Sequence, residues 1–234
     1  MRNDLDMYDR QAASWWDPTS RFAASLHGLN RLRLAHVMDE FGPTMHGQMV
    51  VDLGCGGGLF AEPLALRGAQ VIGIDASAPS LAVAQAHGVG IAGLRYQLAD
   101  LRAPPLPLGC ADLVCCADVL EHVDEWPRAV TAAARLLRPG GKLYVSTINR
   151  TWRARLFAVH LAETLRVIPP GTHDPARFIR PSELTAAATA AGLHCRGFLG
   201  ERLLLLPTLR AWAVRLAPGT STAMGYAAWF QRGP

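Results

Sequence analysis

Four glycines lie close together in the segment Gly54-Cys55-Gly56-Gly57-Gly58, between an apolar run at 48–53 and a segment of helical spacing at 59–66. Glycine has no Cβ, so it permits a sharp turn with positive φ and lets a ligand approach the main chain. The segment therefore predicts a ligand-binding loop between a strand and a helix. The simpler alternative is that the glycines only make a tight turn.

The residues around this loop favour a cationic ligand. The loop contains no basic residue, and Asp52 precedes Gly54, so a pyrophosphate would be repelled while a sulfonium or ammonium group would be attracted. A dinucleotide fingerprint requires glycine at the first, third and sixth positions, but Leu59 stands where the third glycine would fall. A dehydrogenase is therefore disfavoured.

Asp75 ends the next predicted strand, at 70–75, about 20 residues after the first glycine of the loop. An acidic side chain at that position reaches the ribose hydroxyls of a nucleoside in doubly wound folds. Asp75 is thus a predicted cofactor ligand, and the alternative is that it caps the helix predicted at 80–87.

The elements that must position these residues alternate along the chain. Alternation of apolar strands with helices is typical of an α/β domain whose parallel sheet is covered on both faces and binds ligands at the carboxyl ends of the strands. Further strands are predicted at 94–98, 112–117 and 142–147, helices at 126–137 and 181–191, a turn at 138–141, and closing strands at 193–200 and 223–230.

One domain is expected from 234 residues of which 50% are apolar. It divides into an N-terminal helical cap at 1–45 with a helix at 26–41, a cofactor-binding core at 46–150, an inserted amphipathic helix and lid at 151–180, and a segment at 181–234 that completes the sheet. The net charge of +4 comes from scattered arginines without a basic run or an aromatic stacking motif, which disfavours nucleic acid.

The five cysteines show no CxxC spacing, so a zinc cage is disfavoured and a reducing cytosol is expected. The first residues lack the apolar stretch of a signal peptide, and no uncharged apolar run reaches 18 residues. A cytoplasmic location is predicted.

The glycine loop with Asp75 resembles the S-adenosylmethionine-binding motifs of class I methyltransferases. Six further segments, taken together in this order, resemble the ubiquinone-biosynthesis O-methyltransferase family over about residues 8 to 230. They are Ser14-Trp15-Trp16-Asp17, 26–33, Val119-Leu120-Glu121-His122-Val123, Arg138-Pro139-Gly140-Gly141, Ser146-Thr147-Ile148-Asn149-Arg150 and Pro170-Gly171-Thr172-His173-Asp174.

The resemblance implies a Rossmann-like fold with a mostly parallel, seven-stranded sheet and helices on both faces. It implies S-adenosyl-L-methionine as cofactor, ring hydroxyls of polyprenylated phenols and catechols as acceptors, of the 3-demethylubiquinol or 2-polyprenyl-6-hydroxyphenol type, and other ubiquinone-biosynthesis proteins as partners. The alternatives are a methyltransferase of a soluble phenol or of a carbon or nitrogen acceptor, and a non-catalytic protein that binds lipid or cofactor.

By position, the resemblance assigns Arg33 to the cofactor carboxylate, which a guanidinium holds well. It assigns Gly54 and Asp75 to the loop and ribose contacts, and the carbonyl group of Ala117 to the lining of the cofactor site. It assigns Asp100 to a polar contact with adenine; the alternative is that Asp100 only fixes a turn in its loop. Asp52 and Gly56 complete the expected cofactor-binding residues.

Asp118, Glu121 and His122 correspond to the family's acidic cluster for a divalent metal, Mg²⁺ or Zn²⁺, with Asp at 118 where the family more often has Glu. If a helix begins at Asp118, the three side chains share one face and are able to converge on a hard cation. Alternatively, His122 is the general base, or Glu121 and His122 cap a helix.

His173 and Asp174 are expected to lie in a lid and to bind the phenol or assist its deprotonation; the alternative is that Asp174 starts a helix and His173 lies at the surface. The segment 151–168 combines apolar residues with arginines, a pattern found both in core-packed helices and in helices at a membrane interface, and the lipid acceptor favours peripheral membrane association. Leucines at 203–206 replace a tyrosine-containing family segment, so a different acceptor pocket is expected.

Overall fold

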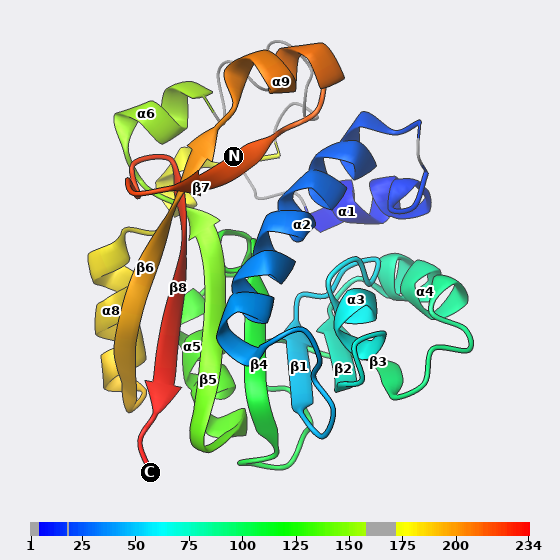
Figure 1. Cartoon of the computed structure of the whole chain (residues 1–234), viewed down its shortest axis with the longest axis vertical. Coiled ribbons are helices and arrows are strands. Elements are labelled where there is room, and N and C mark those ends of the chain that lie inside the picture. Colours follow the sequence, from blue (N-terminus) through cyan, green and yellow to red (C-terminus); the bar gives the residue numbers. More distant parts are fainter. Residues whose placement is uncertain (1–4, 18, 158–171) are drawn as a thin grey trace.

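The computed structural model describes residues 5–17, 19–157 and 172–234, and it confirms the α/β class (Figure 1). Its sheet has the strand order β3-β2-β1-β4-β5-β8-β6-β7. This is one strand more than the seven expected, because the short strand β7 (Leu216–Gly219) pairs with the edge of β6. The extra strand lies far from the glycine loop and leaves the fold class unchanged.

Five parallel strands form the part of the sheet that carries the glycine loop. The predicted positions of these strands are confirmed to within one residue at the ends that carry the loop and Asp75. The strands are β1 (Met49–Leu53), β2 (Gln70–Asp75), β3 (Leu94–Leu98), β4 (Ala111–Ala117) and β5 (Leu137–Ile148).

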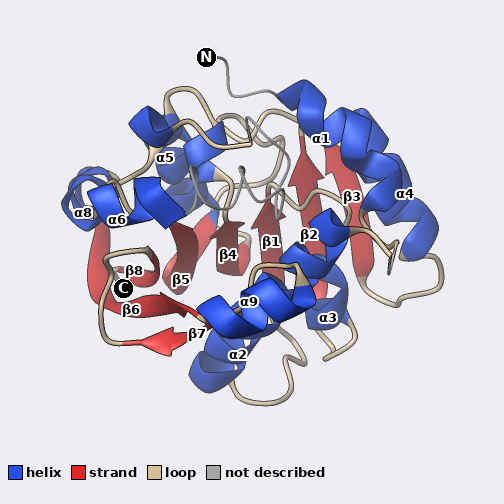
Figure 2. Ribbon diagram, turned by 90° about the horizontal axis from the view of Figure 1, so that it is seen from above, coloured by secondary structure: helices blue, strands red, loops and turns tan. Residues whose placement is uncertain are grey.

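Alternate residues of these strands are buried on opposite faces of the sheet. Val51 and Leu53 pack with α5 (Trp126–Leu136) and α8 (Pro181–Ala190), whereas Val50 packs with α2 (Arg21–Phe41) and α3 (Ala61–Ala65). Helix α4 (Ala78–His87) packs against β3 at the edge of the sheet. Figure 2 shows the two helical layers on either side of the sheet. A sheet covered on both faces offers its strand ends as the place for ligands.

The predicted turn at 138–141 is wrong in one respect, since these residues are part of β5. Leu137 pairs with Ala111 and Lys142 with Leu113, so the register shifts and the intervening residues form an irregularity within the strand. Gly140 has φ +77°, which L side chains rarely adopt. The composition of this segment therefore encodes a bulge and not the end of an element.

The closing strands are β6 (Leu193–Leu203) and β8 (Gly225–Arg232), which pair antiparallel with each other, and β8 also pairs antiparallel with β5. Helix α9 (Leu205–Ala211) follows β6 and occupies the upper end of the molecule in Figure 1. This helix falls on the leucine run whose structure the sequence did not predict.

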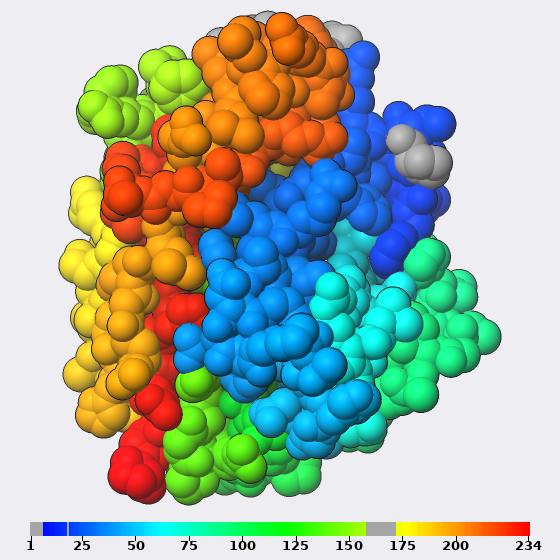
Figure 3. Space-filling view, in the orientation of Figure 1, coloured from blue at the N-terminus to red at the C-terminus, as the bar shows by residue number. Residues whose placement is uncertain are grey.

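The N-terminal helices are α1 (Leu5–Gln11), a 3₁₀ turn (Ala12–Ser14) and α2. Helix α2 begins five residues before the predicted helix because the Ser20 side chain accepts a hydrogen bond from the Ala23 N–H at 3.3 Å and caps it. In the space-filling view of Figure 3, α2 crosses the face of the molecule below α9.

The predicted amphipathic helix at 151–168 lies mostly outside the described residues. Its described beginning is helical at Trp152–Ala154 (α6), where Thr151 caps it. In the part of the chain that the structure describes, no helix has the length and hydropathy needed to cross a membrane.

Candidate active site

A cavity of about 680 Å³ lies at the carboxyl ends of the parallel strands. Of the predicted site residues, all but Asp174 line it. Its cofactor-side lining includes Asp52, Gly54, Gly56, Asp75 and Ala117. Apolar side chains of β6, α9 and β7 line another part of it, among them Leu203, Leu205, Leu209 and Leu216. The cavity therefore joins a polar half to an apolar half.

The conformation and packing of the loop require glycine, as Gly54 and Gly56 show. Gly54 has φ +81°, and a Cβ there would lie 2.2 Å from Cγ2 of Val119. Gly56 has φ +51°, and a Cβ there would lie 2.4 Å from the Trp15 ring. The Trp16 indole N–H donates to the Gly57 carbonyl at 2.8 Å, so the two tryptophans pack over the loop and hold it against the cavity.

Asp75 shapes this loop directly. Its Oδ2 accepts the Gly56 N–H at 2.8 Å, and its Oδ1 accepts the Ser77 N–H, also at 2.8 Å. These bonds oppose the effect of burial, which raises the pKa of Asp75. The carboxylate lies at the cavity wall with lone pairs left for two ribose hydroxyls.

Asp52 lies under the same loop and is buried. Burial, with a smaller contribution from Asp75, raises the pKa of Asp52 to about 7. Its Oδ2 has no hydrogen-bond partner among the described residues. A buried carboxylate of this kind is stabilised in its charged form when a cation enters the cavity.

Arg33 projects from α2 into the cavity and is 2% exposed. Its Nε donates to the Ser146 hydroxyl at 2.8 Å, and its Nη2 forms an ion pair with Asp118. Nη1 is buried and has no hydrogen-bond partner within the described part of the chain. A buried guanidinium with an open N–H is suited to hold a carboxylate.

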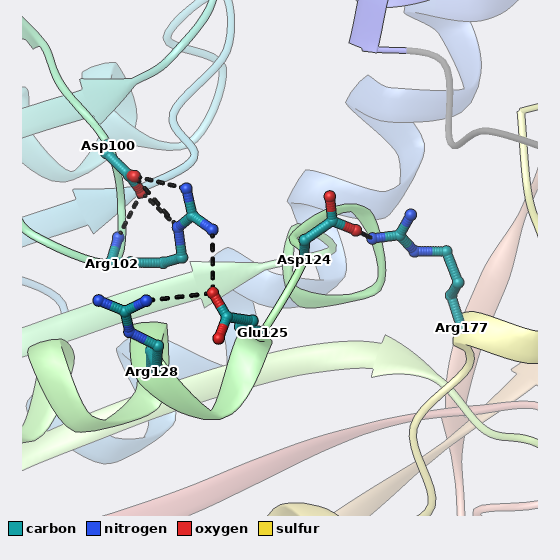
Figure 4. A network of polar contacts seen from close by, with 6 residues as sticks. All are labelled: Asp100, Arg102, Asp124, Glu125, Arg128 and Arg177. Carbon is teal, nitrogen blue, oxygen red and sulfur yellow. Dashed lines mark hydrogen bonds and ion pairs between the residues drawn. The ribbon is translucent and has the colours of Figure 1, made fainter.

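Asp100 lies at the rim of the cavity and is already engaged by Arg102. The Arg102 guanidinium binds both oxygens of Asp100 and reaches Glu125, which also pairs with Arg128 (Figure 4). Arg102 lowers the pKa of Asp100 by hydrogen bonding. A contact of Asp100 with adenine would therefore use lone pairs of the same two oxygens that Arg102 does not engage.

The helix expected to begin at Asp118 is wrong. Asp118 has φ +51°, and only a 3₁₀ turn follows, at Leu120–His122. The three predicted metal ligands consequently have separate partners: Asp118 pairs with Arg33, Oε2 of Glu121 accepts the Thr147 hydroxyl at 2.8 Å, and Nε2 of His122 lies 3.0 Å from the Tyr8 hydroxyl. Among the described residues, no group of three or more His, Cys, Asp or Glu side chains is arranged to hold a metal ion.

Two histidine rings lie close together in the lining of the cavity. The rings of His122 and His173 have centroids 5.8 Å apart, and both residues line the cavity. Burial lowers the pKa of His122 to about 3 and that of His173 to about 4, so both are neutral at physiological pH. Burial also raises the pKa of Glu121, with Asp118 adding to the effect.

Asp174 does not line the cavity with its neighbour. Its Oδ1 accepts the Ala176 N–H at 3.0 Å and caps the 3₁₀ turn Pro175–Arg177, as the alternative interpretation of the sequence had it. His173 is not at the surface, so only the Asp174 half of that alternative is found.

The polar residues of the cavity that sequence reasoning missed include Tyr8, Thr147 and Glu201. Thr147 lies in a segment that carries the family resemblance and was available as a signal. Tyr8 and Glu201 come from the two ends of the chain, and no local pattern marks them as cavity residues.

The chain resembles solved methyltransferases in its fold. A methyltransferase from Thermotoga maritima superposes with a TM-score of 0.70 at 18% identity, covering 97% of this chain and 99% of that one. Magnesium protoporphyrin IX methyltransferase from Synechocystis, solved with bound S-adenosylhomocysteine, superposes with a TM-score of 0.68 at 20% identity, covering 98% and 95%. Residues 51–145 match the family described as methyltransferase domain. The fold, with the loop at the end of β1, is that of the class I S-adenosylmethionine-dependent methyltransferases.

The sequence relatives identify the family within this class. The ubiquinone biosynthesis O-methyltransferase of Marinobacter nauticus is 40% identical over 204 residues, which are 85% of this chain and 84% of that protein. The proteins of the same name from Bordetella bronchiseptica and Pseudomonas aeruginosa are each 42% identical over 84% of this chain and over 82% and 85% of their own lengths. The chain belongs to the ubiquinone biosynthesis O-methyltransferase family.

Proposed function

We propose that this protein transfers the methyl group of S-adenosylmethionine to a ring hydroxyl of a polyprenylated phenol or catechol in ubiquinone biosynthesis. The observation that carries the proposal is the single cavity that joins the glycine loop and Arg33 to buried Glu121 and His122 and then to an apolar end. Family membership supports the reaction class. An apolar end of this kind suits a prenyl chain.

The polar half holds the cofactor. Arg33 binds the carboxylate through its open Nη1, Asp75 binds the ribose hydroxyls, and the main chain at Gly54, Gly56 and Ala117 lines the rest. Asp52 favours the positive charge of the cofactor. Asp100, which is hydrogen-bonded to Arg102, makes a polar contact with the adenine at the rim of the cavity.

The transfer is an in-line displacement in which the phenolic oxygen forms a bond to the methyl carbon as the bond from that carbon to sulfur breaks. The electron pair of the broken bond stays on sulfur, and the phenolic proton goes to Glu121. The ionised form of Glu121 accepts this proton, and its raised pKa makes that carboxylate a stronger base than the neutral, buried His122, which accepts a proton poorly. His122, held by the Tyr8 hydroxyl, positions the acceptor, and His173 lies across the same space. Holding the reactants close in a dry cavity supplies much of the acceleration.

A divalent metal does not fit the described arrangement, because the Asp118 carboxylate is paired with Arg33 and His122 is bonded to Tyr8. No step of this mechanism therefore runs through Mg²⁺ or Zn²⁺. We expect methyl transfer to change by less than about twofold when protein freed of metal by a chelator is assayed without added metal. A loss on chelation that Mg²⁺ or Zn²⁺ restores would show that Asp118 leaves Arg33 to bind a cation.

Peripheral membrane association is proposed from one end of the molecule. Trp152 and Leu156 at α6, and Leu205 and Leu206 at α9, are exposed, and both helices lie at the upper end in Figure 1 with Arg153 and Arg210 beside them. Apolar side chains among arginines suit an anionic bilayer surface, where a polyprenyl acceptor resides. Cosedimentation with anionic vesicles is expected to fall when Leu206 and Trp152 are replaced by Ser, and equal binding by the variant would contradict this surface.

The function is tested by transfer of a radiolabelled methyl group to a short-chain prenyl catechol and to the same catechol without the prenyl group. The expected result is higher kcat/KM for the prenyl acceptor. Equal or better turnover of the soluble catechol would indicate a soluble-phenol enzyme. Binding of cofactor without transfer to either acceptor would indicate a non-catalytic protein.

A further inference from the structure

Two adjacent tryptophans hold the N-terminal segment, residues 5–17, on helix α4, which lies beside it (Figure 2). The Trp15 indole N–H donates to the Ser80 hydroxyl at 3.2 Å in the first turn of this helix. The Trp16 ring lies flat on the ring of His87, the last residue of the helix, with centroids 3.5 Å apart and an angle of 5° between the planes. The two tryptophans thus contact both ends of α4.

Trp16 also contacts the glycine loop. Its indole N–H donates to the Gly57 carbonyl at 2.8 Å while its ring remains stacked on His87. One side chain therefore joins the loop at the end of β1 to the last turn of α4. Because a hydrogen bond depends on the direction of its N–H, the stack that fixes the tilt of the indole also maintains the bond to the loop.

Glu62 fixes the orientation of the His87 ring. It lies in α3, the helix that follows the glycine loop, and its N–H donates to the Gly58 carbonyl at 3.0 Å. Its Oε2 accepts a hydrogen bond of 2.8 Å from Nδ1 of His87, because a carboxylate has no proton to donate. Burial raises the pKa of Glu62, and this hydrogen bond opposes the shift. Glu62 is buried whereas the His87 side chain is 45% exposed, so the carboxylate restrains a ring at the surface.

The N-terminal segment forms part of the cofactor wall, yet it packs in a small cluster of its own. Tyr8, Asp9 and Trp15 of the segment line the cavity. Its cluster is separate from the two larger clusters on the faces of the sheet. The buried members of the small cluster are Met7, Ala12, Trp15, Phe22 and Leu59. A wall with few buried contacts opens more readily than the sheet, so the contacts of Trp16 are well placed to govern its opening.

We propose that His87 and Glu62 are positioning residues for cofactor binding. Glu62 orients His87, His87 holds Trp16, and Trp16 keeps the N-terminal segment and the glycine loop closed over the cofactor. Both positioning residues lie outside the cavity lining in the described part of the chain, so they act on the cofactor through Trp16. This inference rests on the proposed cofactor site and adds to it the contacts that determine how long the cofactor stays bound.

The first test measures the affinity of S-adenosylhomocysteine by calorimetry and its release by stopped-flow tryptophan fluorescence. We expect His87→Ala to raise the dissociation constant about tenfold, mainly through faster release, because it removes a stacked ring and a hydrogen bond to a carboxylate. His87→Phe keeps a flat ring for Trp16 without the bond to Glu62, and should raise the constant only about threefold. At saturating cofactor, kcat should stay within about twofold in both variants, which a general loss of structure would not allow.

A double-mutant cycle tests whether His87 acts through Trp16. In a Trp16→Ala background, His87→Ala and Glu62→Gln should each change the dissociation constant by less than about twofold, since the ring they hold is gone. If Trp16→Ala does not fold, Trp16→Phe, which lacks the N–H for Gly57, replaces it with the same criterion. Undiminished effects in this background would overturn the inference, and so would unchanged affinity and release in the single variant His87→Ala.

The matched control is His194→Ala, which removes another exposed histidine ring. His194 lies on β6, which β4, β5 and β8 separate from β1 and its glycine loop in the sheet. Its removal should leave both the affinity and the release rate within about twofold of the wild type. A rise as large as that of His87→Ala would show that the effect is not specific to the stack and would overturn the inference.

Failure of the proposed cofactor site has its own signature, which is that the wild type binds no S-adenosylhomocysteine. Amide hydrogen exchange of the ligand-free protein then still tests the stack. Exchange in residues 5–17 and 54–60 should be at least about threefold faster in His87→Ala than in the wild type, with exchange in β4 unchanged. Equal exchange at the loop, or a matching increase in β4, would refute the inference.

Discussion

The two halves of the cavity are built by different means. Most of the cofactor half consists of main chain and short side chains from one stretch of sequence, Asp52 to Asp75, and the Asp75 carboxylate accepts the Gly56 and Ser77 N–H groups. Arg33, Asp100 and Ala117 join this half from other parts of the chain. The acceptor half collects side chains from α1, from the 3₁₀ turn after β4, from β5 and from β6, namely Tyr8, Glu121, Thr147 and Glu201. Burial raises the pKa values of Tyr8, Glu121 and Glu201 strongly.

The difference reflects what each half must do. A bound cofactor needs a preformed shape, which a glycine loop and one carboxylate supply locally. Proton transfer and acceptor choice need buried titratable groups, whose pKa values depend on how completely distant segments exclude water. Changes in the acceptor half should therefore act on turnover, and changes in the cofactor half on cofactor affinity.

The largest effect is expected for Glu121→Gln. Removing the proton acceptor should lower kcat by about 100-fold or more, because general base catalysis contributes on that order. The cofactor dissociation constant, measured by calorimetry, should stay within about twofold. An unchanged kcat would show that another group accepts the proton. A parallel loss of cofactor affinity would show that the two halves of the cavity do not act independently.

Asp75→Ala should act in the opposite way. It removes the acceptor of the Gly56 and Ser77 N–H groups and the ribose contact, so the cofactor dissociation constant should rise by about 100-fold, as expected for two hydrogen bonds to a charged group. With saturating cofactor, KM for the acceptor should remain close to that of the wild type. Calorimetric affinity that is unchanged within error would refute the ribose role.

Asp52 should make cofactor affinity depend on pH. The pKa of Asp52 is raised to about 7 in the folded protein, so the group is protonated below that pH and ionised above it. The ionised form attracts the sulfonium, and affinity should increase by about tenfold as pH rises from 6 to 8. Asp52→Asn should remove this part of the pH dependence of cofactor affinity. The pH dependence that remains in the variant measures the titration of the cofactor itself.

The same raised pKa predicts an effect on folding. A carboxyl group with a higher pKa in the folded than in the unfolded state favours folding least when ionised, so the protein without cofactor should lose stability as pH rises towards and through 7. Asp52→Asn should lose less over this range in thermal melts. Equal pH dependence of the wild type and the variant would show that Asp52 does not govern it.

The smallest effect is expected for Tyr8→Phe. The variant loses the hydroxyl that lies 3.0 Å from Nε2 of His122 but keeps the ring that packs edge-on against it. We expect kcat to fall by about fivefold, in line with one neutral hydrogen bond, and cofactor affinity to be unchanged. A loss as large as that of Glu121→Gln would make Tyr8 a proton carrier rather than a positioning residue.

Sequence patterns anticipated much of this fold but not all of the site. Strands β2 and β3 coincide with their predictions, since a continuous apolar run bounded by glycine or polar residues has few other solutions. The turn expected at 138–141 became a bulge in β5, and β7 was missed, because pairing with a neighbouring strand outweighs local composition. Helix α9 was missed as well.

The amino-acid order alone determined the glycine loop, Asp75 and the family, because each depends on residues close in sequence whose backbone conformation and spacing are set locally. Only the tertiary structure decided that Asp118 pairs with Arg33, that His122 meets Tyr8, and that Glu201 is buried beside the cavity. These contacts join segments far apart in the chain, and burial, which sets their charges, exists only once those segments have packed together.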